Sequence, residues 1–258
     1  MGIKISIITV SLNAVAYIET ALQSVHAQTY PCLEHVVIDG GSTDGTLEVV
    51  DQYRDRLAYF MSEPDRGIYH AMNKGIKIAT GDVLFFLNAD DRFADRQVVA
   101  DVVSVFSQNA DLEIVYGNLL REFSGNIVQR KQPSTITREY LAGRTILHQT
   151  VFARREVFDT TSGFSEHYRV VSDYEWALKV FLRDRRNYLY YDRDIAVMDT
   201  RGRSWTTKWE NERLRVMMKY FGPYEIFKCR VWPRQKNSLE SSLGTALHRL
   251  ANFVKREI

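Results

Sequence analysis

The stretch Val83-Leu84-Phe85-Phe86-Leu87-Asn88-Ala89-Asp90-Asp91 joins five apolar residues directly to a polar cluster that holds two adjacent carboxylates. An apolar run of this length between polar residues predicts a strand that is buried on both faces. The C-terminal end of such a strand is where open α/β sheets bind their ligands. Because adjacent carboxylates repel each other, Asp90 and Asp91 indicate a site for a divalent cation, Mn²⁺ or Mg²⁺, and a solvated loop is the alternative.

Upstream of this stretch, strand-like and helix-like segments alternate. Apolar runs at 5–10, 36–38 and 57–61 are followed by helical periodicity at 18–25, 46–50 and 68–79. This alternation predicts βαβ units, hence an α/β fold with a mostly parallel central sheet flanked by helices. Parallel strands end at one edge of a sheet, so we expect Thr9, Asp39, Glu63 and Asp91 to gather around one crevice.

Several motifs, in a fixed order and spacing, carry a family resemblance. They are ISIITVSLN (5–13), VVIDGGSTDGT (36–46), SEPDRGIYHAMNKGI (62–76) and FFLNADD (85–91). Together they resemble family 2 glycosyltransferases, and most closely the bacterial enzymes that assemble exopolysaccharide, colanic acid and O-antigen repeat units. The resemblance continues through His148-Gln149 and Val171-Ser172-Asp173-Tyr174, and it covers about residues 3–215.

The resemblance implies a GT-A fold over residues 1–215, followed by a tail. Residues 1–92 would form a Rossmann-like half that binds the nucleotide-sugar, and residues 93–215 a half that binds the acceptor. Residues 216–258 would form a basic, amphipathic, helical C-terminal tail.

The resemblance also implies which residues bind the nucleotide. Asp39 matches an Asp that accepts a hydrogen bond from the base, which suits the imide N–H of uracil and favours a UDP-sugar, with an Asx turn as the alternative. Arg66 is placed to meet phosphate, although a solvated loop cation remains open. The nucleotide-binding set is Thr9, Val10, Ser11, Asn13, Asp39, Glu63, Arg66, Asn73 and Asp90.

The chain departs from the family pattern in two places. Asn88 stands where many relatives have the first Asp of an Asp-x-Asp motif, so Asp90 and Asp91 must supply the metal-binding charge. Which of the two contacts the metal directly stays open. The loop Thr200–Trp205 replaces a Gly-Gly-x-Ser motif, and there Arg201 or Arg203 is expected near the donor diphosphate, the transferred sugar or an anionic acceptor.

The resemblance assigns the catalytic base to Asp173. This residue opens a helical segment, and a helix N-terminus favours the ionised carboxylate that a base needs. A helix cap is the alternative role of Asp173, and Glu175 is the nearest rival carboxylate. His148 and Gln149 match a His-Gln pair near the donor sugar, although an isolated histidine is by default a structural one.

Composition sets limits on the class of protein. The 258 residues are 45% hydrophobic, enough for one sizeable core. A net charge of +2 gives no support for nucleic acid as a partner. Cys32 and Cys229 show no disulfide or zinc pattern and suit the cytoplasm. No segment is long and apolar enough to span a bilayer, nor does the N-terminus resemble a signal peptide.

The tail predicts an interface. From Lys219 onward it carries a net charge of +5, and Phe227, Val231 and Trp232 alternate with the cations. This pattern suits an anionic membrane surface on the inner face of the membrane. Packing on the domain itself or on a second subunit, as in a homo-oligomer, is the alternative.

Together these features predict an inverting, metal-dependent glycosyltransferase. It would move a sugar from a nucleotide-diphosphate sugar to an acceptor hydroxyl, on a glycan or a lipid-linked glycan of a bacterial surface polysaccharide. A sugar nucleotidyltransferase is an alternative, although Ser11-Leu12-Asn13-Ala14 is not the Gly-rich phosphate loop that it needs. A catalytically silent, nucleotide-binding partner subunit is the other, supported by Asn88 and the altered 200–205 loop.

Overall fold

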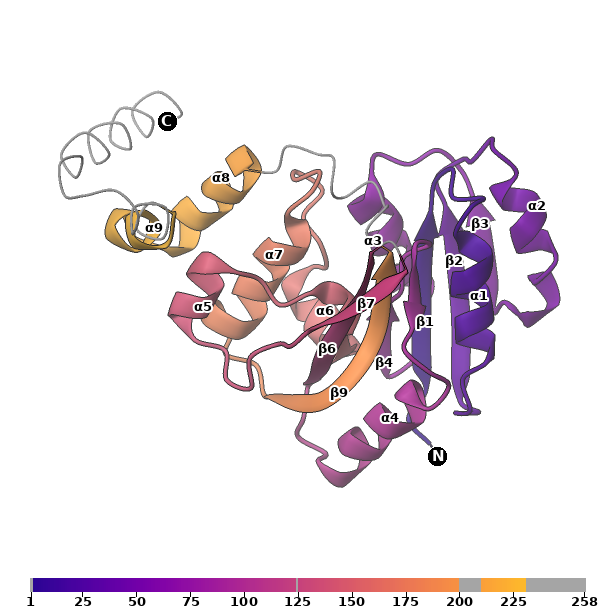
Figure 1. The fold of residues 1–258 in the computed structure, drawn as a ribbon, viewed down its shortest axis with the longest axis horizontal. Helices are drawn as coiled ribbons and strands as arrows, with labels where there is room; N and C mark the ends of the chain where they lie inside the picture. The colour runs from indigo at the N-terminus through magenta and orange to yellow at the C-terminus, as the bar shows by residue number, and fades with distance from the viewer. Residues whose placement is uncertain (1, 124, 200–209, 231–258) are drawn as a thin grey trace.

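The computed structural model of the chain describes residues 2–123, 125–199 and 210–230. Its strands are β1 (Ile5–Ser11), β2 (Leu33–Asp39), β3 (Tyr59–Ser62), β4 (Val83–Phe86), β5 (Asp91–Phe93), β6 (Ile114–Phe123), β7 (Asn126–Arg130), β8 (Val151–Arg154) and β9 (Tyr188–Asp199). They form one sheet in the order β3-β2-β1-β4-β8-β6-β9-β5, and β7 pairs with β6 at the side (Figure 1).

The first half of the sheet is the predicted parallel one. β1 pairs in parallel with both β2 and β4, and β2 pairs in parallel with β3. The connecting helices are α1 (Ile18–His26), α2 (Thr46–Asp51) and α3 (Ile68–Ile78), with a short 3-10 turn, η1 (Arg54–Arg56). This confirms the predicted α/β fold with its Rossmann-like, mostly parallel first half.

The second half of the sheet is mixed. β8 runs antiparallel to its neighbours β4 and β6, β9 runs parallel to β6, and β5 runs antiparallel to β9. β6 and β7 pair antiparallel as a hairpin. Because β8 is antiparallel to β4, the residues that lead into β8 lie at the edge where β4 ends. This edge, at the C-terminal end of β4, is called the active edge below.

Two hydrophobic layers cover the sheet. The remaining helical elements are α4 (Val98–Gln108), α5 (Arg138–Gly143), η2 (His148–Thr150), α6 (Arg155–Thr161), α7 (Ser172–Ala177), η3 (Leu178–Arg183), α8 (Glu210–Tyr220) and α9 (Pro223–Arg230). One layer packs Val99, Val102 and Phe106 of α4 against Phe85 and Phe152 of the sheet. The other packs α3, α5, α6, α7 and α8 on the opposite face, around residues such as Tyr116 and Trp176.

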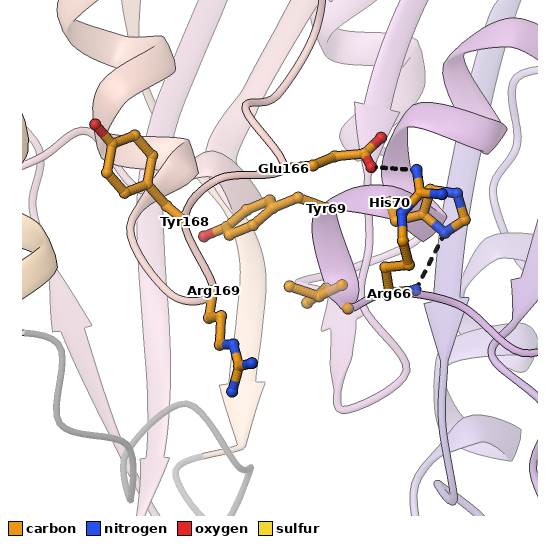
Figure 2. Close-up of a pocket in the computed structure, with 8 residues that line it drawn as sticks. Arg66, Tyr69, His70, Glu166, Tyr168 and Arg169 are labelled. Atoms are coloured by element: carbon orange, nitrogen blue, oxygen red, sulfur yellow. Dashed lines mark hydrogen bonds and ion pairs between the residues drawn. The ribbon is translucent and has the colours of Figure 1, made fainter.

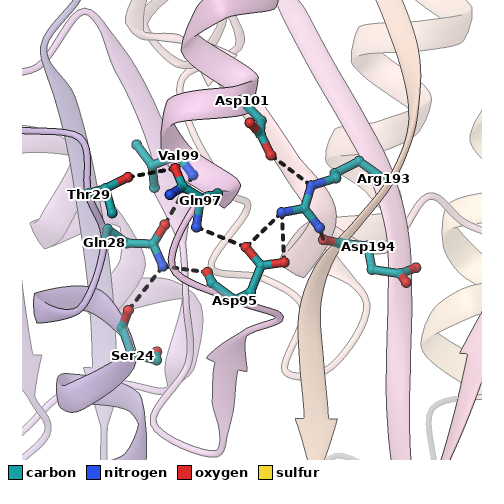
Figure 3. A network of polar contacts seen from close by, with 9 residues as sticks. All are labelled: Ser24, Gln28, Thr29, Asp95, Gln97, Val99, Asp101, Arg193 and Asp194. Carbon is teal, nitrogen blue, oxygen red and sulfur yellow. Dashed lines mark hydrogen bonds and ion pairs between the residues drawn. The ribbon is translucent and has the colours of Figure 1, made fainter.

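A polar network fixes β9 to the loop between β5 and α4 (Figure 3). The guanidinium of Arg193 donates to the carboxylates of Asp95 (2.7 Å) and Asp101 (3.0 Å). Gln28, just after α1, ties down the same loop by donating to the Asp95 carbonyl (2.8 Å) and accepting from the Val99 N–H (3.1 Å). These contacts hold β5, which begins with Asp91, against β9.

The described part of the tail packs on the domain. Ile226 of α9 is 3% exposed and belongs to the same core as Met217 of α8, and Phe227 beside it is 4% exposed. Arg138 of α5 pairs with Glu225 at 2.6 Å. Exposure of Phe227 toward a membrane is therefore a wrong prediction, because its side chain is buried. Val231 and Trp232 lie outside the described residues.

Membrane spanning is not seen in the described ranges. None of their helices is long and apolar enough to cross a bilayer.

Candidate active site

Asp39 ends β2 as an acceptor for five donors. Its Oδ1 accepts from the hydroxyls of Ser11 (2.9 Å) and Ser42 (2.5 Å). Its Oδ2 accepts from the backbone N–H groups of Gly41 (2.9 Å) and Ser42 (2.8 Å) and from the Ser62 hydroxyl (2.8 Å). Burial alone would raise the pKa of Asp39, but the hydrogen bonds outweigh it and lower the pKa. The Asx turn is thus present, and base contact stays a prediction.

The residues that end β1 take up different positions. Thr9 and Val10 are buried, and the Thr9 hydroxyl lies 3.0 Å from Nε2 of His35. Ser11 is tied to Asp39, as described. Asn13 is exposed and adopts a left-handed conformation with φ of 51°, in which its Oδ1 accepts from the Thr43 N–H at 2.9 Å. Asn13 is therefore the member of this set whose side chain lies on the open surface.

Glu63, Arg66 and Asn73 are engaged with protein partners in this structure. Glu63 pairs with Lys74 at 2.7 Å, and the largely exposed Arg66 pairs with Glu166 at 2.6 Å. The Asn73 amide donates to the Phe164 carbonyl (2.8 Å) and accepts from the Phe164 N–H (2.9 Å). Asn73 thus fastens the loop before α7 to α3, and nucleotide contact by these three residues stays a prediction.

A small pocket lies beside this loop (Figure 2). It is lined by Arg66, Gly67, Ile68, Tyr69, His70, Glu166, Tyr168 and Arg169. Figure 2 shows Arg66 reaching Glu166, with the ring of Tyr69 and the side chain of Arg169 further along the same wall. His70 accepts from the Arg66 N–H through Nδ1 at 3.2 Å.

Asp90 and Asp91 form an acidic pair at the active edge. Asp91 is 2% exposed, and neither of its carboxylate oxygens has a hydrogen-bond partner among the described residues. Burial raises the pKa of Asp91 well above its ordinary value, and the charge of Asp90 raises it further. Burial also raises the pKa of Asp90. The structure therefore places two neighbouring carboxylates in a buried position that disfavours their ionisation.

Asp199 joins this pair, and the sequence motifs do not point to it. It ends β9, and its N–H donates to the Asp90 carbonyl at 3.3 Å. Its charge contributes to the raised pKa values of both Asp90 and Asp91. Pairing of β9 with β5 brings these residues together, and no local spacing in the sequence encodes that pairing.

A second group of polar side chains crosses the active edge. The amide nitrogen of Asn88 lies 3.2 Å from Nε2 of His148, and Nδ1 of His148 lies 3.3 Å from Oδ2 of Asp173. The Tyr69 hydroxyl lies 3.1 Å from Oδ1 of Asp173 and 2.8 Å from the Val170 carbonyl, so its one proton can be donated to either oxygen. If the Asn88 amide donates to Nε2, the proton of a neutral His148 resides on Nδ1 and points at Asp173. The structure thus brings Asn88, His148 and Asp173 together.

Asp173 lies in the first turn of α7 without capping it. The residue at the N-cap position is Val171, and no side chain caps the helix. The cap role is therefore wrong, because the carboxylate turns toward His148 and Tyr69. Glu175 is 5% exposed and pairs with Lys179 (3.5 Å) and Lys219 (3.3 Å), so the contacts of this rival carboxylate are with lysines of η3 and α8.

Gln149 follows His148 into the interior. It is 8% exposed, and its amide lies 3.6 Å from the sulfur of Met198. Contact of His148 and Gln149 with the donor sugar stays a prediction. Arg203 and the rest of the 200–205 loop lie outside the described residues.

Comparison with known proteins identifies the class to which this fold and site belong. The model of the family described as "Glycosyl transferase family 2" matches residues 6–172. The chain belongs to this family, and the membership decides against the sugar nucleotidyltransferase.

Named relatives agree with the family assignment. The PGL/p-HBAD biosynthesis glycosyltransferase of Mycobacterium bovis (strain BCG / Pasteur 1173P2) is 34% identical over 179 residues, which are 68% of this chain and 69% of that protein. A glycosyltransferase of Mycobacterium tuberculosis (strain CDC 1551 / Oshkosh) is 34% identical over 180 residues, which are 69% of each chain. The protein is therefore a glycosyltransferase related to these mycobacterial proteins.

Solved structures share the fold. S. aureus TarS (residues 1–349) in complex with UDP-GlcNAc superposes with a TM-score of 0.70 at 20% identity, covering 96% of this chain and 72% of that one. The mannosyltransferase PcManGT of Pyrobaculum calidifontis, in complex with GDP-Man and Mn²⁺, gives a TM-score of 0.59 at 17% identity, covering 99% and 80%. The predicted GT-A-like fold is thus confirmed.

Proposed function

We propose that this glycosyltransferase transfers a sugar from a UDP-sugar to the hydroxyl of a lipid-linked glycan, with inversion at the anomeric carbon. The observation that carries the proposal is the position of Asp173, held by His148 and Tyr69 at the edge where Asp90 and Asp91 lie. A base and an acidic pair on one edge can act on the attacking hydroxyl and on the leaving group of one displacement reaction. The UDP-GlcNAc complex of TarS supports the choice of donor.

In this mechanism Asp173 accepts the proton of the acceptor hydroxyl. The acceptor oxygen then attacks the anomeric carbon from the side opposite the leaving diphosphate, so no covalent sugar–enzyme intermediate forms. His148 and Tyr69 contact different oxygens of Asp173 and thereby fix the plane of its carboxylate. The pocket of Figure 2 adjoins this base through Tyr69, which suits binding of the acceptor sugar there.

The residues present fit a divalent cation. The described ranges hold no cluster of three or more His, Cys, Asp or Glu side chains arranged around a metal position. Mg²⁺ and Mn²⁺ sites of nucleotide enzymes are commonly completed by substrate phosphates and water, with one or two protein carboxylates. Asp90 and the unpartnered oxygens of Asp91 supply those carboxylates. When bound, the cation stabilises negative charge on the leaving diphosphate.

Asp39 would bind the base if one of its protein hydrogen-bond donors were replaced by a donor of the base. All five of its present donors are protein groups, and only Ser62 among them lies on the open surface. Rotation of the Ser62 hydroxyl would free Oδ2 for the imide N–H of uracil. The lowered pKa of Asp39 keeps it an acceptor at neutral pH.

The test is Asp173→Asn, which preserves shape and removes the ability to accept a proton. We expect the affinity for UDP-sugar to be unchanged and the transfer rate to fall by about 10²–10⁴-fold, the usual contribution of a general base. Asp159→Asn, which changes an exposed carboxylate of α6, is the matched control. Near-normal transfer by Asp173→Asn would show that another group is the base. A wild-type chain that binds UDP-sugar without transfer or hydrolysis would support the silent subunit instead.

A further inference from the structure

Three arginines gather beside the active edge: Arg121 of β6, Arg130 at the end of β7, and Arg144, which follows α5. In the β6–β7 ladder Arg121 pairs with Val128 and Arg130 with Leu119, so the two arginines lie diagonally on one face. The Tyr140 hydroxyl lies within hydrogen-bond distance of Gln132 (3.3 Å) and of the Thr145 carbonyl (3.4 Å). Tyr140 therefore holds the segment that carries Arg144 against the end of β7.

The three cations repel each other. Burial lowers the pKa of Arg121, and the charge of Arg130 lowers it further. Burial likewise lowers the pKa of Arg130, and Arg144 contributes in the same direction. Within the ranges that the structure describes, no carboxylate pairs with Arg130 or Arg144. Arg121 and Arg130 are half-buried, and Arg144 is exposed beside them. Neighbouring half-buried cations are costly unless an anion compensates them, so the arrangement suits an anion site.

This cluster adjoins the catalytic machinery. Met198 of β9 pairs with Arg121 on one side and with Asp91 on the other, so the three residues form one row across the sheet. Directly paired residues of neighbouring strands share a face. Arg121 and Asp91 are thus separated by a single strand on the same face. Arg144 lies four residues before His148, on the segment that enters the active edge.

Exposed apolar side chains continue from the cluster along the hairpin. Phe123 and Val128, on the face of Arg121, are 67% and 62% exposed, and Ile127 on the other face is 54% exposed. Exposed apolar side chains that are grouped on one surface mark an interaction site. The hairpin thus offers cations near the active edge and apolar surface further out.

We propose that Arg121, Arg130 and Arg144 bind the phosphate end of an acceptor carried on an apolar chain, and that the chain lies along Phe123 and Val128. Guanidinium groups bind phosphate through paired N–H donors, which suits a phosphate or diphosphate group. A phosphate group on an apolar chain can contact the arginines and the exposed apolar side chains at once, whereas a free phosphate contacts only the arginines. The inference rests on the proposed transfer to a lipid-linked glycan and adds to it the site that recognises the acceptor.

The experiment uses the full chain and calorimetry with farnesyl diphosphate, farnesol, inorganic pyrophosphate and UDP with Mn²⁺. The test variant is Arg130→Gln/Arg144→Gln, and the control of equal charge is Arg96→Gln/Arg185→Gln, at exposed arginines elsewhere. We expect the wild type to bind farnesyl diphosphate more tightly than either pyrophosphate or farnesol. The test variant should lose at least about 10-fold in affinity for farnesyl diphosphate, with UDP affinity unchanged, since two charge-assisted contacts are lost.

A second variant, Phe123→Ser/Val128→Ser, separates the two surfaces. This variant should have a lower affinity for farnesyl diphosphate and an unchanged affinity for pyrophosphate. Unchanged affinity for farnesyl diphosphate in the arginine variant would overturn the proposal. So would an equal loss of UDP affinity, which would assign the cluster to the donor diphosphate. If the wild type does not bind farnesyl diphosphate, and the arginine variant binds phosphatidylglycerol vesicles less than the wild type does, the cluster would be assigned to membrane headgroups. Because farnesyl diphosphate binding is measured without transfer, failure of the proposed reaction would be seen separately.

Discussion

At the scale of single residues, Asp91 is a destabilising feature of the fold. Its carboxylate is buried, adjoins another carboxylate, and finds no hydrogen-bond partner in the described residues. We expect Asp91→Asn to raise the Tm of the metal-free protein, by about 2–4 °C for each kcal/mol of relieved repulsion. The same variant should weaken Mn²⁺-dependent UDP binding at least about tenfold, because one of two anionic ligands is lost.

Scanning calorimetry and UDP titration, each with and without Mn²⁺, measure both effects. Asp159→Asn should change neither quantity. A variant that loses stability while keeping Mn²⁺-dependent binding would mean that Asp91 serves the fold.

His35 determines part of the acid sensitivity. Burial, with a smaller effect of His26, lowers its pKa from 6.5 to about 3. In the unfolded chain His35 therefore binds a proton below pH 6.5, whereas in the folded chain it stays neutral down to about pH 3. The contribution of His35 to the free energy of unfolding is therefore fully present above pH 6.5. It is lost as the pH falls toward 3, by up to about 1.4 kcal/mol per pH unit.

Replacing His35 with Gln keeps a polar partner for Thr9 and removes this titration. We expect urea unfolding between pH 7 and pH 5 to show a smaller loss of stability in His35→Gln than in the wild type. His167→Gln, at an exposed histidine, should retain the wild-type slope. Equal slopes in all three proteins would contradict the assignment.

The motifs predicted much of the candidate site and missed the rest for a physical reason. Asn88, His148 and Asp173 follow recognisable patterns, and the structure brings them together. Tyr69 and Asp199 have no such signal. Tyr69 belongs to the site only because a loop folds back over α3, and Asp199 because β9 lies beside β5. Tertiary pairing of this kind leaves no mark in local spacing.

At the scale of elements, one side chain adds to the strand pairing that positions β9. Arg193 pairs with Asp95 and Asp101, and thereby ties β9 to the loop after β5 (Figure 3). We expect Arg193→Leu to lower the free energy of unfolding by about 1–2 kcal/mol, since the pairs are partly exposed. Mn²⁺-dependent UDP binding should fall as well, because Asp91 begins β5.

Urea unfolding and UDP titration measure the two effects of Arg193→Leu. Arg183→Leu is the control, since Arg183 pairs only with its neighbour Asp184 among the described residues. If Arg193→Leu lowers stability without affecting UDP binding, β9 does not position the acidic pair.

The order of elements was also only partly predictable. Alternating strands and helices predicted the parallel half, because each βαβ unit is local. The antiparallel insertion of β8 between β4 and β6 was not predicted. A strand such as Val151–Arg154 is equally apolar whichever direction its neighbours run, so periodicity reports its existence and not its partner.

At the scale of the whole molecule, the beginning of the tail is part of the domain. Ile226 belongs to the core that α5 and α8 share, and Phe227 next to it is buried. Truncation after Gly222 removes both, so we expect a loss of about 3 kcal/mol or more, in line with large-to-small changes in cores. Truncation after Arg230 keeps both residues and is the matched comparison.

Liposome binding of these chains tests the membrane prediction. If residues 231–258 supply the contact with anionic lipid, the chain that ends at Arg230 should sediment less with phosphatidylglycerol vesicles at low salt. Equal sedimentation of this chain and the full chain would locate membrane binding elsewhere, or nowhere.

The mixed sheet has a consequence for folding. Asn88 and His148 are 60 residues apart in the chain, and Tyr69 and Asp173 are 104 apart, yet both pairs are in contact. Contacts of such long sequence separation pay a large loop-closure entropy and dominate slow folding. No fragment of the chain can assemble the base with its two partners. Recovery of transfer activity after dilution from urea should therefore lag behind recovery of helical circular dichroism, and report the last step of assembly.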